Sequence, residues 1–436
     1  MFLILPIILN NYRRNTYQQS DHKTAQGGFL LSSKYSTIRV EMNIDQKQKP
    51  FKLPTNFLLG AASSAHQVEG NNTNSDWWHE ERLGKLPKSG DAADHYNRFD
   101  EDFSLAKSIG LEAMRISIEW ARIEPQPNKW DTDAIEHYRK VLQTMKKQGL
   151  TRMVTLHHFT LPQWAAERGG FTNKDNVAAF IRYAQYIAEQ LGTEIDLWNT
   201  INEPEVFTYM SSIRGFWPPF SKSLSRAFFL FRGLAAAHKG AYHAIRAVIP
   251  EAQISIAKNN VYNEPFRNNF LDKTAVALNN WFGNYWFLNK IKNEIDFIGL
   301  NYYFYHSLTV TLRGGIVQKN LDGPKSDMGW RTFPEGIYHL LMDLSKKYNK
   351  PLYITENGIA NARDDMRQDF IREHLYWTNR AIEDGADVRG YFYWSLTDTH
   401  EWHDGFGPKF GLIEVNFETQ KRTVRPSADV FKQLRS

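Results

Sequence analysis

The sequence predicts an α/β fold, a single (β/α)8 barrel of the TIM type, for residues 51–436. From residue 57 onward, short apolar segments alternate with amphipathic helical segments through eight repeats, which is the element order of such a barrel. No residues are left over for a second sheet, and no low-complexity linker marks a domain boundary after about residue 50. The alternative is a doubly wound sheet with an appended domain. It is disfavoured because no glycine-rich phosphate-binding motif opens any of the helices.

The predicted strands are short runs of mostly apolar and β-branched residues bounded by polar or turn-forming residues. They span residues 57–62, 113–118, 152–157, 196–201, 253–257, 296–300, 352–355 and 390–396. Between most of these strands, apolar residues recur at the spacing of a helix that buries one face. The clearest of these helices span residues 131–148, 173–191, 224–249 and 368–384.

Residues 1–50 differ from the rest and are predicted to form a disordered or loosely attached extension. They carry seven Lys or Arg and three acids, so they account for +4 of the net charge of +5. The remaining chain is nearly neutral, and a nucleic-acid-binding surface is therefore not indicated. The apolar run at residues 1–9 is too short to span a membrane, and it lacks the basic start and the cleavage site of a signal peptide. Met42 is an alternative start of the protein.

The absence of cysteine excludes disulfides, thiolate catalysis and cysteine-bound metals. This composition fits a reducing compartment, so a cytoplasmic location is predicted, with secretion through the atypical N-terminal segment left open. Nothing in the sequence indicates an oligomeric state.

Two predicted strands end in a carboxylate, which is a costly group to bury without a partner. Glu356 follows the apolar residues 352–355 and precedes Asn-Gly, and Glu203 follows residues 196–202 and precedes Pro204. Two carboxylates at the C-terminal ends of different strands are what glycoside cleavage requires. The alternative is that each acid forms an ion pair with a Lys or Arg of the scaffold.

Polar and aromatic side chains follow seven of the eight predicted strands, at the face where barrels carry their sites. Beyond Glu203 and Glu356, these side chains include Gln67, Arg115, His158, Asn202, Asn301, Tyr303, Trp394, Glu401 and Trp402.

From residue 53 to the C-terminus the chain resembles the β-glucosidases of glycoside hydrolase family 1. The matching stretches include FLLGAASSAHQVEG, MRISIEWARIEP, TLHHFTLPQW, WNTINEPEV, DFIGLNYY, YITENGIA and YFYWSLTDTHEWHDGFGPKFGLIEVNF. The resemblance implies a retaining β-glycosidase that acts on a small glycoside or oligosaccharide and needs no metal or cofactor. It implies that Glu203 is the acid/base and Glu356 the nucleophile, that Arg115 and Tyr303 contact the nucleophile, and that Trp394 forms the floor of the sugar subsite. The sugar hydroxyls would be held by Gln67, His158, Asn202, Glu401 and Trp402.

These roles require Glu203 to be protonated while Glu356 is ionised, and Arg115 and Tyr303 would favour ionised Glu356. His157 is predicted to be structural, and three other acids are predicted to form ion pairs of the scaffold: Glu69, Glu119 and Glu124. His403-Asp404 is not expected to bind a metal, because no third ligand accompanies it.

The chain departs from the family at Phe159, where a Trp is usual, at Thr160, where an Asp is usual, and in the segment containing Trp217. The stretches at residues 259–294 and 304–331, after the fifth and sixth strands, look short for the family, which predicts an open aglycone side. A carboxylate at Glu401 favours an unphosphorylated sugar. The sequence does not distinguish among the glucose, galactose and fucose configurations of the substrate. The alternative functions are a transglycosylating enzyme and a non-catalytic sugar-binding barrel.

Overall fold

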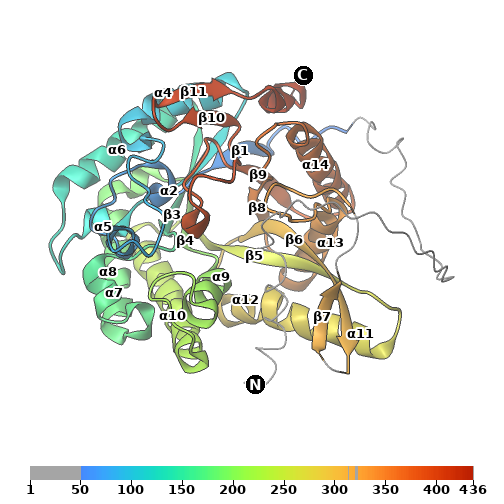
Figure 1. Ribbon diagram of the computed structural model, residues 1–436. Helices are drawn as coiled ribbons and strands as arrows, with labels where there is room; N and C mark the ends of the chain where they lie inside the picture. Colours follow the sequence, from blue (N-terminus) through green and yellow to red (C-terminus); the bar gives the residue numbers. More distant parts are fainter. Residues whose placement is uncertain (1–50, 313, 320–322, 436) are drawn as a thin grey trace, which may run out of the picture.

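A computed structural model describes residues 51–312, 314–319 and 323–435. Eight parallel strands close into a barrel, in which each strand pairs with its two neighbours and β5 pairs with β6 (Figure 1). The predicted barrel is confirmed. Its strands in order around the ring are β1 (Leu58–Ala62), β2 (Ala113–Ser117), β3 (Thr151–His157), β4 (Leu197–Asn202), β5 (Gln253–Pro265), β6 (Ile298–Thr311), β8 (Leu352–Asn357) and β9 (Val388–Trp394).

Side chains of the strands alternate between the barrel interior and the surrounding helices. On β2, Met114 and Ile116 belong to the large core shared with the helices, whereas Ala113 packs with Met153 of β3 inside the barrel. Arg115 also points inward and donates to Thr155 Oγ1 at 3.0 Å. The interior is therefore apolar at the N-terminal end of the strands and polar at the C-terminal end.

Helices surround the barrel because each buries one apolar face against the strands. In α6, for example, Asp131 caps the first turn by accepting from the N–H of Ala134, and Ile135, Leu142 and Met145 are buried. The predicted long helices are confirmed as α6 (Thr132–Lys147), α8 (Lys174–Leu191), α10 (Leu224–Val248) and α14 (Arg367–Glu383). The other α-helices are α2 (Ala65–Val68), α3 (Asp76–Arg82), α4 (His95–Ser108), α5 (Trp120–Ile123), α7 (Gln163–Glu167), α9 (Pro204–Tyr209), α11 (Phe270–Asn279), α12 (Trp286–Ile291), α13 (Glu335–Tyr348) and α15 (Val430–Gln433).

Strands β5 and β6 are longer than predicted, and they extend into the two stretches that were expected to be short for the family. The two strands stay paired as far as Pro265 and Leu308, and β7 (Gly315–Lys319) then pairs antiparallel with β6. Polar residues such as Lys258 suggested that the strand ends. In the fold, however, the Lys258 ammonium lies 3.1 Å from the Glu205 carboxylate, so this polar residue is satisfied inside a continuing strand.

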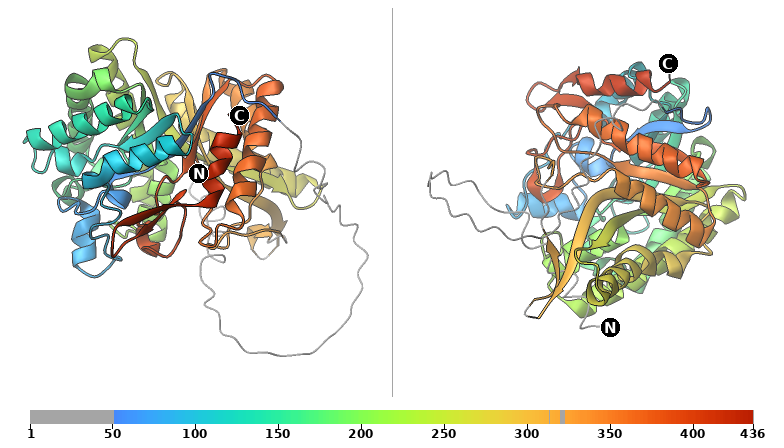
Figure 2. Two further views of the ribbon diagram at one scale, coloured as in Figure 1. Left: turned by 90° about the horizontal axis from the view of Figure 1, so that it is seen from above. Right: turned by 90° about the vertical axis from the view of Figure 1, so that its right-hand side faces the viewer.

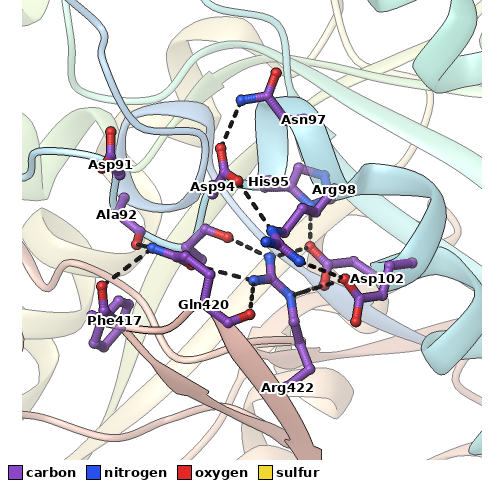
Figure 3. A network of polar contacts seen from close by, with 12 residues as sticks. Asp91, Ala92, Asp94, His95, Asn97, Arg98, Asp102, Phe417, Gln420 and Arg422 are labelled. Atoms are coloured by element: carbon purple, nitrogen blue, oxygen red, sulfur yellow. Dashed lines mark hydrogen bonds and ion pairs between the residues drawn. The ribbon is translucent and has the colours of Figure 1, made fainter.

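The expectation that the chain forms no second sheet is wrong, because the structure contains a small two-stranded sheet. It is the hairpin of β10 (Ile413–Asn416) and β11 (Lys421–Val424), which lies beside α4 although the two are about 320 residues apart (Figures 1 and 2). Arg422 of β11 joins them by donating to Asp102, which also bonds His95 at 2.7 Å (Figure 3). Arg422 thus fixes the C-terminal hairpin to α4.

No helix in the described part of the chain combines the length and the apolar content needed to cross a bilayer. The predicted N-terminal extension lies outside the described residues.

Candidate active site

The two carboxylates found in the sequence open onto one cleft at the C-terminal end of the barrel. Glu356 belongs to β8, and Glu203 directly follows β4, where it precedes Pro204 at the first position of α9. Both are almost completely buried, at 6% exposure for Glu203 and 5% for Glu356. Glu203 also has a left-handed backbone with φ of 42°, a conformation that is uncommon for non-glycine residues.

Glu356 is held by one cation and one hydroxyl. Arg115 Nη1 donates to its Oε1 at 2.5 Å, and the Tyr303 hydroxyl donates to its Oε2 at 2.9 Å. Burial raises the pKa of Glu356, and the guanidinium and the hydroxyl oppose that rise because both stabilise the ionised form. The pKa of Glu356 stays above its ordinary value, but this carboxylate has a cation and a hydroxyl that favour its ionised form.

Glu203 has amide neighbours instead of a direct cation. Asn301 and Asn259 donate to its Oε1 at 2.8 and 3.2 Å. Burial and then the charge of Glu356 raise the pKa of Glu203 to about 8. When the two acids hold one proton between them, the proton is therefore on Glu203. This difference in protonation is what general acid catalysis requires.

A chain of hydrogen bonds fixes the tautomer of His158. Arg115 has only donors, so its 2.8 Å contact identifies Oδ1 of Asn202 as the acceptor. The amide nitrogen of Asn202 then donates to His158 Nε2 at 3.2 Å, which leaves the ring proton on Nδ1. Burial lowers the pKa of His158 well below its ordinary value, so the ring is neutral. Among the described residues no group accepts from the buried Nδ1, which leaves it available to a ligand hydroxyl.

The cleft has a volume of about 750 Å³ with its open mouth included, a size suited to a small ligand. Eight of the ten predicted site residues line it: Gln67, His158, Glu203, Tyr303, Glu356, Trp394, Glu401 and Trp402. The other two, Arg115 and Asn202, lie behind this wall and are fully buried. Asn202 was predicted to hold a sugar hydroxyl; its carbonyl accepts from Arg115 and its amide nitrogen donates to His158, and the role toward the sugar stays a prediction.

Glu401 and Gln67 form a polar pair on one wall. Gln67 Nε2 donates to Glu401 Oε2 at 3.1 Å, and Thr399 donates to the same oxygen at 3.0 Å. Burial raises the pKa of Glu401 to about 8. Trp402 packs beside this pair, with its ring stacked at 6.0 Å from that of His158.

With this geometry established, comparison with known proteins identifies the family. The sequence model of glycosyl hydrolase family 1 matches residues 49–293 and 288–436. The chain belongs to glycosyl hydrolase family 1. Enzymes of this family are retaining glycosidases, and this protein is a retaining β-glycosidase.

Individual family 1 proteins are similar over almost their whole length. A 1,4-beta-D-glucan glucohydrolase of Thermotoga neapolitana is 33% identical, over 86% of this chain and 96% of that protein. A beta-galactosidase of Pyrococcus woesei is 31% identical, over 87% of this chain and 96% of that protein. The structure of a beta-glycosidase from Pyrococcus horikoshii superposes with a TM-score of 0.84 at 39% identity, covering 89% of this chain and 96% of the other.

The departures from the family sequence at Phe159, Thr160 and Trp217 have local explanations. Phe159 packs against Trp217 with ring centroids 4.8 Å apart, so an indole from the segment after α9 fills the space beside the smaller ring. Trp217 also donates through Nε1 to His403 Nδ1 at 3.1 Å. Thr160 points away from the cleft and donates to Glu119 at 2.8 Å.

The contacts of the residues that were predicted to be structural agree only in part with the prediction. His157 packs on Phe171 and Phe207 with ring centroids about 5 Å away, as a structural residue should. Glu69 forms an ion pair with Arg122 at 2.8 Å, and Glu124 lies 3.5 Å from Arg182. The expected ion pair of Glu119 is wrong, because Glu119 instead accepts from Thr160 and from the N–H of Ala121.

One group of potential metal ligands exists among the described residues, formed by His66, Glu81 and His400. His66 Nε2 lies 3.0 Å from Glu81 Oε1, and the other carboxylate oxygen accepts from the N–H and hydroxyl of Ser89. His400 Nε2 lies 3.2 Å from the carbonyl of Pro87. These hydrogen bonds give each of the three residues a structural partner. The cluster therefore supports Gln67 and Trp402 from behind.

Sequence reasoning assigned no role to several cleft residues. Asn259 was missed because the fifth strand was ended too early, and a longer strand would have placed it at the same rim as the other amides. Asn301 was placed at the rim but received no function. The apolar mouth is formed by six side chains, of which only Val206 and Phe410 lie in stretches that match the family: Val206, Met210, Phe304, Met328, Trp330 and Phe410.

Proposed function

We propose that this family 1 protein hydrolyses β-D-glucosides, and with them β-D-galactosides, with Glu356 as nucleophile and Glu203 as acid/base. The observation that carries the proposal is the unequal environment of the two acids. Glu356 is bonded by a guanidinium and a phenol, and Glu203 is bonded by two amides. The names of the relatives, which include beta-glucosidases and a beta-galactosidase, support this choice of sugars.

In the first step, Glu356 attacks the anomeric carbon while Glu203 gives its proton to the departing glycosidic oxygen. Formation of the glycosyl ester removes the negative charge of Glu356. Because that charge helps to hold the pKa of Glu203 near 8, the pKa then falls and Glu203 becomes a base. In the second step Glu203 takes a proton from water, the water oxygen attacks the anomeric carbon, and Glu356 leaves as a carboxylate.

The sugar is proposed to lie on Trp394, with hydroxyls bonded by Gln67, Glu401 and the Nδ1–H of His158. Glu401 with a pKa of about 8 can either donate or accept at neutral pH, which suits a sugar hydroxyl. A phosphorylated sugar would place an anionic group in this buried part of the cleft, where burial already disfavours the charged form of Glu401, so unphosphorylated glycosides are favoured.

The leaving group is proposed to be small and apolar. The mouth of the cleft presents Met210, Phe304, Met328 and Trp330, and an alkyl or aryl aglycone would cover these side chains. Methionine adapts its shape to different partners, which favours tolerance of several aglycones.

A panel of 4-nitrophenyl β-glycosides tests the sugar and the two roles. Glu356→Ala should lower kcat/KM on the glucoside by at least about 10³-fold, and azide should rescue it as the α-glycosyl azide. Glu203→Ala should lose much more activity on alkyl glucosides than on 4-nitrophenyl glucoside, which needs little protonation, and azide should give the β product. The exposed acid Glu136 is the matched control, and Glu136→Ala should be unchanged. Retention of activity by Glu356→Ala, or the opposite product stereochemistry, would contradict the assignment.

A further inference from the structure

Most of the large exposed apolar side chains lie on α11, on the segments beside it and at the tip of the β6–β7 hairpin, and none of them lines the cleft. Of the nine large apolar side chains that are more than about a third exposed among the described residues, six belong to this region. We call them the α11 face: Phe266, Phe270, Leu271, Leu278, Trp281 and Leu312. Phe270 is 81% exposed, Leu271 59% and Leu312 108%. Both elements lie at the edge of the molecule, where the hairpin reaches beyond the barrel (Figures 1 and 2).

The helix is apolar on both sides, which is unusual at a protein surface. Its inner side packs through Ala275 and Val276 on Leu308 and Ile316 of the hairpin. The outer side repeats apolar residues at helical spacing from Phe270 to Trp281, the latter in the π-helical turn that follows α11. Internal packing therefore explains only the inner side.

The exposed face is held rigidly. Asp272 is fully buried and accepts from Arg267 at 2.9 Å and from the backbone N–H of Val310 at 2.9 Å. This anchor joins the first turn of α11 to the hairpin that carries Leu312. The apolar residues of the two elements are thus presented together as one surface.

The border of this face is positively charged. Residues 264–292 contain four Lys or Arg and two carboxylates. Asp272 and Arg267 neutralise each other in an ion pair, whereas Glu264 keeps its charge while it accepts from the Tyr305 hydroxyl, so the three remaining lysines leave a net charge of +2. Lys273 lies exposed on α11, and the Lys319 ammonium lies 5.7 Å from the ring of Phe266.

We propose that the α11 face docks the enzyme on the surface of an anionic lipid bilayer. An apolar helix face bordered by lysines, with a Trp at its end, has the composition of helices that lie in the membrane interface. The apolar residues would enter the acyl boundary while Lys273 and Lys319 meet the lipid phosphates.

Co-sedimentation with vesicles tests the proposal. The intact protein should bind vesicles of equal parts phosphatidylglycerol and phosphatidylcholine, and much less pure phosphatidylcholine, at low salt. Lys273→Ala should weaken binding to the anionic vesicles about fivefold. Phe270→Ser with Leu271→Ser should weaken binding at least tenfold on both compositions, because two apolar anchors are removed.

Matched controls keep the test specific. Leu83 lies elsewhere and is exposed to 57%, so Leu83→Ser should bind like the wild type. Every variant should keep the wild-type rate on a soluble 4-nitrophenyl glycoside, which reports folding independently of docking. Failure of the wild type to bind anionic vesicles would overturn the proposal. So would binding that is indifferent to the Phe270 and Leu271 changes, or a dimer in light scattering that these changes dissociate.

Discussion

At the scale of single residues, the unequal neighbours of Glu203 and Glu356 set the pH dependence of the enzyme. Free enzyme is competent while Glu356 is ionised and Glu203 is protonated. We therefore expect kcat/KM to fall as the pH rises through about 8, where Glu203 loses its proton. A pH profile of kcat/KM with an alkaline limb several units away from 8 would contradict this expectation.

Two substitutions should move opposite limbs of that profile. Tyr303→Phe removes a donor that favours ionised Glu356, so the pKa of Glu356 rises and the acidic limb moves to higher pH. Asn259→Ala removes a donor that favours ionised Glu203, so its pKa rises and the alkaline limb moves to higher pH. Each variant should leave the other limb in place, and a uniform loss of rate in both would indicate a merely structural role.

The raised pKa of Glu203 also predicts how stability depends on pH. Because the folded state binds the proton more tightly than the unfolded chain, the stability contributed by Glu203 is fully present below pH 4.5. It is lost as the pH rises through about 8. Glu203→Gln cannot ionise, so its Tm should exceed that of the wild type by a few degrees at pH 9. The two Tm values should converge near pH 4, and equal Tm values at both pH values would contradict the buried, protonated state.

At the scale of elements, a side chain from the segment after α9 occupies space beside the loop that follows β3. Phe159, with φ of 72°, leaves space that Trp217 fills. Phe159→Trp should therefore overpack the wall and lower kcat/KM about tenfold or more. Trp217→Ala in the same chain should recover part of that loss.

A double-mutant cycle of kcat/KM for Phe159→Trp and Trp217→Ala measures this coupling. Phe216→Ala is the control, because its side chain is 37% exposed and does not line the cleft. Purely additive effects would show that the two rings do not compete for space.

At the scale of the whole molecule, buried ion pairs fix the C-terminal hairpin to the first helices. Arg422 is 1% exposed at its side chain and bonds Asp102, whereas Arg98 of the same network is 40% exposed (Figure 3). Arg422→Ala should lower the free energy of unfolding by about 3–5 kcal/mol, because it leaves Asp102 buried without its guanidinium. Arg98→Ala should cost less than about 1 kcal/mol. Denaturant titration of both variants tests the difference, and equal losses would contradict it.

The sequence predicted most of the barrel because its signals are local. Alternating strands and amphipathic helices reveal themselves through periodicity, and acids such as Glu203 and Glu356 stand out after apolar strands. The errors have different causes. Lys258 ended the predicted fifth strand because its distant partner Glu205 could not be known. The hairpin of β10 and β11 pairs residues only 5 to 11 positions apart, so it was missed although its signal is local.

By itself, the sequence determined the (β/α)8 barrel, the family and the two acids, since each follows from short motifs and their order. Only the tertiary structure decided which acid holds the proton, the tautomer of His158 and the position of Trp217 against Phe159. It also decided that an apolar helix face meets solvent beside Lys273 and Lys319. The physical reason is that burial, charge proximity and hydrogen bonding depend on distances between side chains, and those distances join residues that lie up to hundreds of positions apart.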